Sequence, residues 1–199
     1  MLIVLYILLG LIFLLPFHPV LGLHALSKMD AALSSAFERI VHGAYWISAI
    51  SGLILVFVKA ITVFTRNILG VNFIWLQESG LYLFAAMFLL AGGAIWLIDG
   101  HVRVDIFYSR LTPRQKARLD LVGIYAFILP VCALIVYAAT PYVARSWATL
   151  EGSTAPSGIH AVYLLKTSIP CFAVILAMAC YVRARGLLSL LRGEDAAPR

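Results

Sequence analysis

The residues of this chain that could take part in chemistry are a few ionisable side chains placed inside long apolar runs. Lys59 and Glu78 each lie in a stretch that is otherwise almost wholly hydrophobic. A charged side chain in such a place reaches toward the membrane surface at the end of the run, pairs with an opposite charge or faces a cavity. Lys59 can therefore extend toward Arg66 or pair with Glu78. Because both cations approach the membrane face near Glu78, we expect one of them to be its partner.

Motifs that normally indicate catalysis are absent from the sequence. It has no Walker A sequence, no His-Glu-x-x-His, no Gly-x-Ser-x-Gly and no paired carboxylates. Cys132, Cys171 and Cys180 show no metal-ligand spacing, and we interpret them as small buried hydrophobic residues. His42 and His101 fall on one membrane side, which leaves a haem between them as a minor alternative. We predict no enzymatic activity, no metal and no cofactor.

Composition indicates that lipid is the solvent for most of the chain. Of its 199 residues, 63% are hydrophobic and 12% are charged, and the mean hydropathy is +0.98. A soluble domain carries about 25% charged residues. The apolar runs are continuous and about 20 residues long, enough to cross about 30 Å of hydrocarbon as helices, whereas transmembrane strands alternate. We predict an all-α integral membrane protein. The net charge of +6 does not indicate a nucleic-acid partner, because the basic residues cluster at the ends of the apolar runs.

Four core spans must position the ionisable residues. Trp75, Gln77 and Glu78 open the second span, where Trp75 suits the membrane interface. Lys166 lies near the start of the fourth span and can extend outward. Small residues such as those of Ala173-x-x-x-Ala177 allow helices to approach closely. The predicted spans are about 44–64, about 76–98, 113 to about 145, and about 159–182.

The third helix has a clear start signal in the sequence. Thr112 can cap it, Pro113 suits its first position and Gln115 completes a Thr-x-x-Gln capping box. From Pro113 to about Arg145 the helix would be about 50 Å long at 1.5 Å per residue. We expect Pro130 to kink it.

Two features precede the first core span. Residues 1–28 are mostly apolar and are either a cleaved signal peptide, an extra uncleaved helix, or a segment upstream of a natural start at Met29; we favour the extra helix. Residues 29–42 mix charged and apolar positions. One helical face there predicts an amphipathic helix at the membrane surface and consists of Leu33, Phe37, Ile40 and Val41.

Lysine and arginine counts predict the orientation. The connection 99–120 and the C-terminal segment are rich in basic residues, whereas the other two connections carry essentially Arg66 and Arg145. The basic segments should face the cytoplasm, which places both core termini inside. The basic residues in question are Arg103, Arg110, Arg114, Lys116, Arg118, Arg183, Arg185, Arg192 and Arg199.

Several local patterns resemble a known family. The most specific is His101-Val-Arg103-Val-Asp105-x-Phe-Tyr, followed by Leu111-Thr-Pro-Arg114 and Asp120. Others are Arg66 with Gly70, Trp75-x-Gln77-Glu78, Glu151-x-Ser153 and Lys166-x-x-x-Pro170. On these residues, the segment 29–192 resembles the small membrane subunit of TRAP (tripartite ATP-independent periplasmic) transporters, the DctQ family, with residues 193–199 as a polar tail.

The resemblance implies a non-catalytic small permease subunit of the bacterial inner membrane. It would hold a large membrane subunit, which carries the substrate and ion sites, and would offer a docking surface to a periplasmic solute-binding protein. Uptake of an organic acid would be driven by an ion gradient, usually of sodium. Glu78 and Arg66 would form a polar clasp on the outer side. His101, Arg103 and Asp105 would hold the cytoplasmic hinge, with Asp105 or Asp99 pairing nearby arginines.

Two other functions stay open. A membrane-anchor subunit of a redox enzyme, with haem or quinone, is the first alternative. A stand-alone channel or sensor is disfavoured, because no repeated polar stripe lines a pore.

Overall fold

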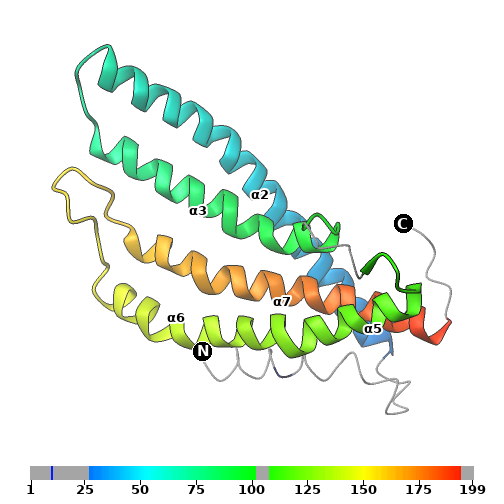
Figure 1. Ribbon diagram of the computed structural model, residues 1–199. Coiled ribbons are helices and arrows are strands. Elements are labelled where there is room, and N and C mark those ends of the chain that lie inside the picture. The colour runs from blue at the N-terminus through cyan, green and yellow to red at the C-terminus, as the bar shows by residue number, and fades with distance from the viewer. Residues whose placement is uncertain (1–9, 11–26, 102–107, 194–199) are drawn as a thin grey trace.

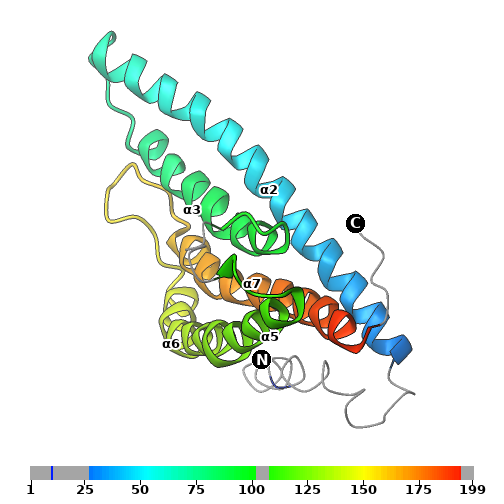
Figure 2. The ribbon, with the colours of Figure 1, turned by 45° about the vertical axis from the view of Figure 1, so that its right-hand side comes forward.

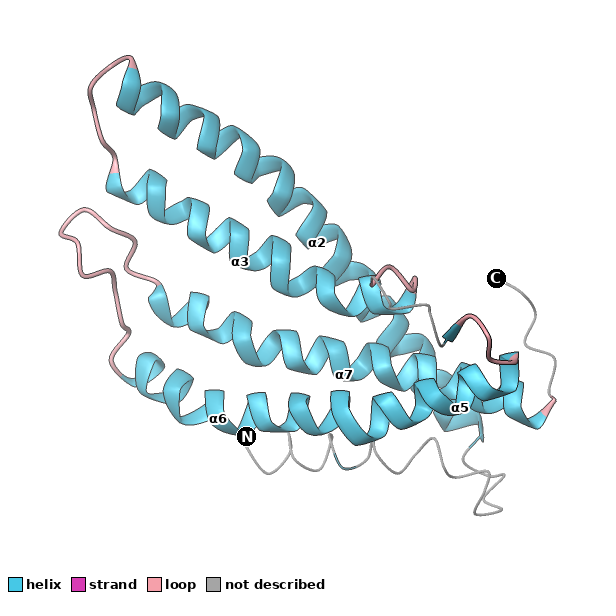
Figure 3. Ribbon diagram, in the orientation of Figure 1, coloured by secondary structure: helices cyan, strands magenta, loops and turns pink. Residues whose placement is uncertain are grey.

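The computed structural model describes residue 10 and the ranges 27–101 and 108–193 (Figure 1). The extra helix expected within residues 1–28 therefore falls almost entirely outside the described residues, as do Arg103, Asp105 and most of the polar tail. The described part of the chain forms helices and contains no strand (Figure 3). These elements are α2 (Ser27–Asn67), α3 (Ile74–Leu97), α5 (Pro113–Gly123), the π-helical segment η3 (Ile124–Ile128), α6 (Leu129–Ala148) and α7 (Val162–Arg192).

Four described helices are long and apolar enough to cross a membrane. They are α2, α3, α7 and the continuous helix Pro113–Ala148, which is made of α5, η3 and α6. The best 18-residue windows have mean hydropathies from 1.8 to 2.4. The prediction of four helical core spans is confirmed.

The separate surface helix predicted at residues 29–42 is wrong, because α2 is one helix of 41 residues. At 1.5 Å per residue it is about 60 Å long, twice the hydrocarbon thickness. No proline interrupts it, so nothing ends the helix before the first span. Ile40, which belongs to the predicted apolar face, is 48% exposed, whereas Phe37 and Val41 of that face are buried. The buried positions recur at alternating steps of four and three residues, the spacing of a helix–helix seam, and are Asp30, Ser34, Phe37, Val41, Ala44, Ser48 and Ser51.

The third helix begins as predicted and contains a π-helical turn. Thr112 N donates to Gln115 Oε1 at 2.9 Å and Gln115 N donates to Thr112 Oγ1 at 3.4 Å, which confirms the capping box. A kink was expected at Pro130, and the structure has the π-helical segment η3, which ends two residues before the proline. Proline has no N–H and its ring collides with the carbonyl four residues earlier, so a widened turn accommodates it.

Helix α7 is longer than the predicted span of about 159–182. It runs to Arg192, and Gly193 ends it in the left-handed conformation at φ 75°. Arg183 and Arg185 were expected to follow the span, but they lie on the helix itself. Their side chains are therefore held at defined positions against the neighbouring helices.

The four helices form an open layer and not a closed bundle. Helix α2 packs mainly on α3, α3 on α7, and α7 on α6, with further contact between α2 and α7. Helices α2 and α6 lie at opposite edges and the helices fan apart toward one end (Figures 1 and 2). We call the end with connections 68–73 and 149–161 the loop end, and the opposite end, with connection 98–112, the basic end.

The main apolar core lies among α2, η3, α6 and α7. The small residues Ala173, Ala177 and Ala184 let neighbouring helices approach α7 closely. Tyr181 and Phe37 meet edge to face, with ring centroids 5.3 Å apart. Because Phe37 and Tyr181 lie near the basic ends of α2 and α7, this core fastens the helices where they converge.

Candidate functional site

Glu78 connects helix α3 to the connection 149–161 at the loop end. It lies one turn after the start of α3, and its carboxylate accepts hydrogen bonds from Ser153 Oγ and from Ile159 N, the latter at 2.6 Å. A Cβ on Gly158 would sit 2.7 Å from Glu78 Oε2 and closer still to Ser153, so only glycine fits there. The carboxylate thus organises a connection more than 70 residues away in sequence.

The ion pair expected between Glu78 and Arg66 or Lys59 is not formed. The ion pairs of the described residues join Lys166 to Glu151, Arg183 to Asp99 and Asp120, and Arg185 to Asp30. Lys59, Arg66 and Glu78 do lie together around one cavity, but the sequence did not predict the two donors from a distant loop. Each oxygen of Glu78 accepts one of these hydrogen bonds, from Ser153 Oγ and from Ile159 N.

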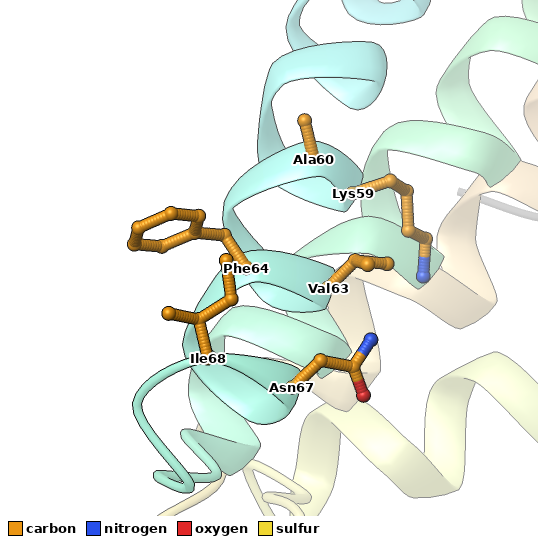
Figure 4. A pocket seen from close by; sticks show the side chains of 6 residues that line it. All are labelled: Lys59, Ala60, Val63, Phe64, Asn67 and Ile68. Atoms are coloured by element: carbon orange, nitrogen blue, oxygen red, sulfur yellow. The ribbon is translucent and has the colours of Figure 1, made fainter.

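The predicted residues of the loop end nevertheless surround one cavity. A space of about 530 Å³ lies between α2 and α3, and Lys59, Arg66, Gln77 and Glu78 all line it. Gln77 Nε2 donates to Asn72 Oδ1 at 2.6 Å. Figure 4 shows Lys59 beside a neighbouring hollow on α2. Trp75 does not line the cavity; it is 51% exposed, as an interfacial tryptophan would be.

Lys166 pairs with Glu151 and does not extend freely outward. Its ammonium donates to Glu151 Oε2 and lies 4.1 Å from the centre of the Tyr142 ring. The hydrogen bond from Lys166 lowers the pKa of Glu151 below its ordinary value of 4.5. This pairing, not anticipated in the sequence, closes connection 149–161 onto α7.

Arg183 is the centre of the contacts at the basic end. Its Nη2 donates to Asp99 Oδ1 at 3.1 Å and to Asp120 Oδ2 at 3.2 Å, which joins the end of α3 to α5 through α7. The guanidinium also lies 5.5 Å from the Trp96 ring centre. The expectation that Asp99 pairs with an arginine is confirmed. His101 lies beside Trp96, with ring centroids 5.9 Å apart.

A second contact at the basic end was missed in the sequence. Asp30 is 5% exposed; it accepts a hydrogen bond from Arg185 Nε at 2.7 Å and one from the Tyr181 hydroxyl. Asp30 lies within residues 29–42, the segment that was predicted to be a surface helix. The sequence did contain a signal for its burial, because Asp30, Ser34 and Phe37 follow the same alternating steps of four and three residues as the rest of the buried face.

The remaining residues that the sequence analysis singled out lie outside the contacts described above. Arg114 is exposed on the first turn of α5. His42 accepts a hydrogen bond from Trp46 Nε1 at 3.0 Å. Cys132 and Cys180 are buried as expected, whereas Cys171 is exposed, which corrects its assignment. Across residues 27–101 and 108–193, no group of three or more His, Cys, Asp or Glu side chains could hold a metal.

These features define a helical, multi-pass membrane protein whose charged residues join helix ends. Residues 55–190 match the family model described as "Tripartite ATP-independent periplasmic transporters, DctQ component". The chain therefore belongs to the DctQ family, the small permease components of TRAP transporters. Comparisons with curated proteins and with solved structures gave no significant match. The predicted family is confirmed, and the comparisons give no support to a redox-enzyme anchor.

Proposed function

We propose that this chain is the structural subunit that holds the large membrane subunit of a TRAP transporter in the bacterial inner membrane. The large subunit carries the substrate and ion sites, and a periplasmic binding protein delivers an organic acid whose uptake is driven by an ion gradient, usually of sodium. The observation that carries this proposal is the family match over residues 55–190. This subunit itself performs no chemistry.

The open helix layer supports a role in holding a partner. Helix α2 lies at an edge, and large apolar side chains on it and on α3 are more than 60% exposed, as at Leu53, Val56, Phe57 and Phe88. In a membrane these faces meet either lipid or the helices of another subunit. They therefore offer the contact area that a scaffold needs.

The charges at the basic end support a cytoplasmic location for it. Described basic residues gather there on α5 and the last turns of α7, and helix α2 also begins there (Figure 1). Positive charge favours the cytoplasmic side of a membrane. In this orientation both core termini are inside, and connection 149–161 faces the periplasm, where it forms part of the surface on which the binding protein docks.

Reconstitution tests this function. Vesicles containing the large subunit and this chain, supplied with binding protein and a sodium gradient, should accumulate an organic acid. Vesicles lacking this chain should lose most uptake, and the chain alone should transport nothing. Uptake by the isolated chain, or full uptake without it, would contradict the proposal.

A further inference from the structure

The cavity between α2 and α3 carries a net positive charge, because two cations and one carboxylate line it. Lys59 and Arg66 line it from α2, and Glu78, whose carboxylate accepts hydrogen bonds from Ser153 and Ile159, lines it from α3. Among the described residues, none of the ion pairs includes Lys59 or Arg66. A cation inside an apolar span normally finds a partner, because leaving it alone there is costly.

Lys59 reaches sideways onto α3 and does not extend toward the end of its own helix. An added Cβ at Gly80 would lie 2.7 Å from Lys59 Nζ, so the ammonium packs directly against this glycine of α3. Gly80 lies six residues after Ile74, the first residue of α3. At 1.5 Å per residue, the ammonium is about 9 Å inside the start of that helix.

This depth decides which kind of anion fits. Lipid phosphates lie with the headgroups, near the level of Arg66 at the end of α2, and not two helical turns inside the span. An acidic side chain on a neighbouring transmembrane helix can be presented at the level of Lys59. Exposed apolar residues beside the cavity, Val63 and Leu81 among them, offer such a helix a surface for packing.

We infer that the α2–α3 cavity receives an aspartate or glutamate from a transmembrane helix of the large subunit, which pairs with Lys59. This inference rests on the proposed function, because it takes the large subunit as the partner. Arg66, nearer the membrane surface, adds positive charge at the mouth of the cavity. Gly80 is the α3 residue against which the ammonium packs.

Chemical cross-linking tests the contact directly. A membrane-permeant carbodiimide, which joins an amine to a carboxylate in contact, is applied to the co-expressed complex, and the products are mapped by mass spectrometry. We expect an amide between Lys59 and an acidic residue of the large subunit. The same amide formed to Glu78 instead, or no amide at Lys59, would overturn the inference.

Substitution provides the second arm. Lys59→Arg should keep the complex, whereas Lys59→Glu should lower recovery of the large subunit at least about tenfold, since like charges cost several kcal/mol. Arg145→Glu is the matched control, because it reverses a charge at the loop end on α6, away from the cavity. Lys59→Met separates a lost contact from misfolding. As an isolated chain it should have the melting temperature of the wild type, and it should nevertheless recover less of the large subunit.

Three outcomes separate the possible failures. Recovery of Lys59→Glu equal to that of Arg145→Glu would overturn this inference alone. Loss of a bound anionic lipid from Lys59→Met in native mass spectrometry, with the large subunit fully recovered, would assign the cavity to a headgroup and overturn it as well. Failure of the wild-type chain to co-purify with the large subunit would overturn the proposed function itself.

Discussion

At the scale of single residues, Glu78 shows how one carboxylate in a membrane span can organise a distant loop. Its two hydrogen bonds, from Ser153 Oγ and Ile159 N, tie α3 to connection 149–161. The same contacts leave Lys59 and Arg66 available to a partner.

Replacement of Glu78 should release connection 149–161. Glu78→Ala removes both hydrogen bonds and should lower the melting temperature, speed hydrogen exchange at the Ile159 amide and weaken assembly with the large subunit. Ser153→Ala, which removes one bond, should have a smaller effect. Unchanged exchange at Ile159 and full recovery of the complex in Glu78→Ala would rule out this role.

Replacing a glycine with alanine should have opposite effects on stability at Gly158, at the loop end, and at Gly186, near the basic end. A Cβ at Gly158 meets Ser153 and Glu78, whereas one at Gly186, inside α7, meets nothing within 4 Å. Gly158→Ala should therefore destabilise the protein. Gly186→Ala should stabilise it by about 0.5–1 kcal/mol, the helix-propensity difference. Thermal unfolding in detergent measures both, and a rise in melting temperature for Gly158→Ala would contradict the packing described.

At the scale of helices, α2 is held to α7 at the basic end by a buried polar contact. Asp30 meets Arg185 and Tyr181 beside the main apolar core. Because the Arg185 side chain is 42% exposed, water screens the pair and reduces its net contribution. The contact nevertheless holds the first turns of α2 against α7.

Removing Asp30 should detach the first turns of α2. Asp30→Ala leaves the Tyr181 hydroxyl without its partner and should cost about 1–3 kcal/mol, the usual penalty for an unsatisfied buried group. Hydrogen exchange across residues 27–41 should rise. Tyr181→Phe gives a control in which only the hydroxyl is lost. Unaltered protection of residues 27–41 in Asp30→Ala would show that apolar packing alone holds the helix.

At the scale of the whole molecule, charge is distributed unevenly between the two ends. The loop end carries connected polar groups and one positively charged cavity, whereas the basic end carries most of the arginines. The helices converge at the basic end and fan apart at the loop end (Figure 1). The cavity lined by Lys59, Arg66 and Glu78 lies at the loop end, between α2 and α3.

Charge reversal should test the orientation. Arg114, Lys116 and Arg118 together changed to Glu should disturb insertion, because positive charge near a span retains it on the cytoplasmic side. Reporter fusions after residues 110 and 155 should give cytoplasmic and periplasmic signals in the wild type and mixed signals in the variant. An identical pattern in both would contradict the prediction.

The local features of this protein could be predicted from neighbouring residues. Apolar runs long enough to span a membrane and the Thr112–Gln115 capping box each depend on residues that are close in sequence. Their energetics are local, so position in the fold hardly affects them. Even so, the continuity of α2 was missed, because charged residues at its start looked like a surface segment.

The partners of the charged residues required the folded arrangement. Glu78 meets a loop 75 to 81 residues away, and Asp30 meets side chains 151 and 155 residues away. Sequence spacing indicated which charges lie near which membrane face, but several donors compete for each carboxylate there. Which donor wins depends on how the helices pack in three dimensions, and for that reason Glu78 binds Ser153 and Ile159 while Lys59 lies on Gly80.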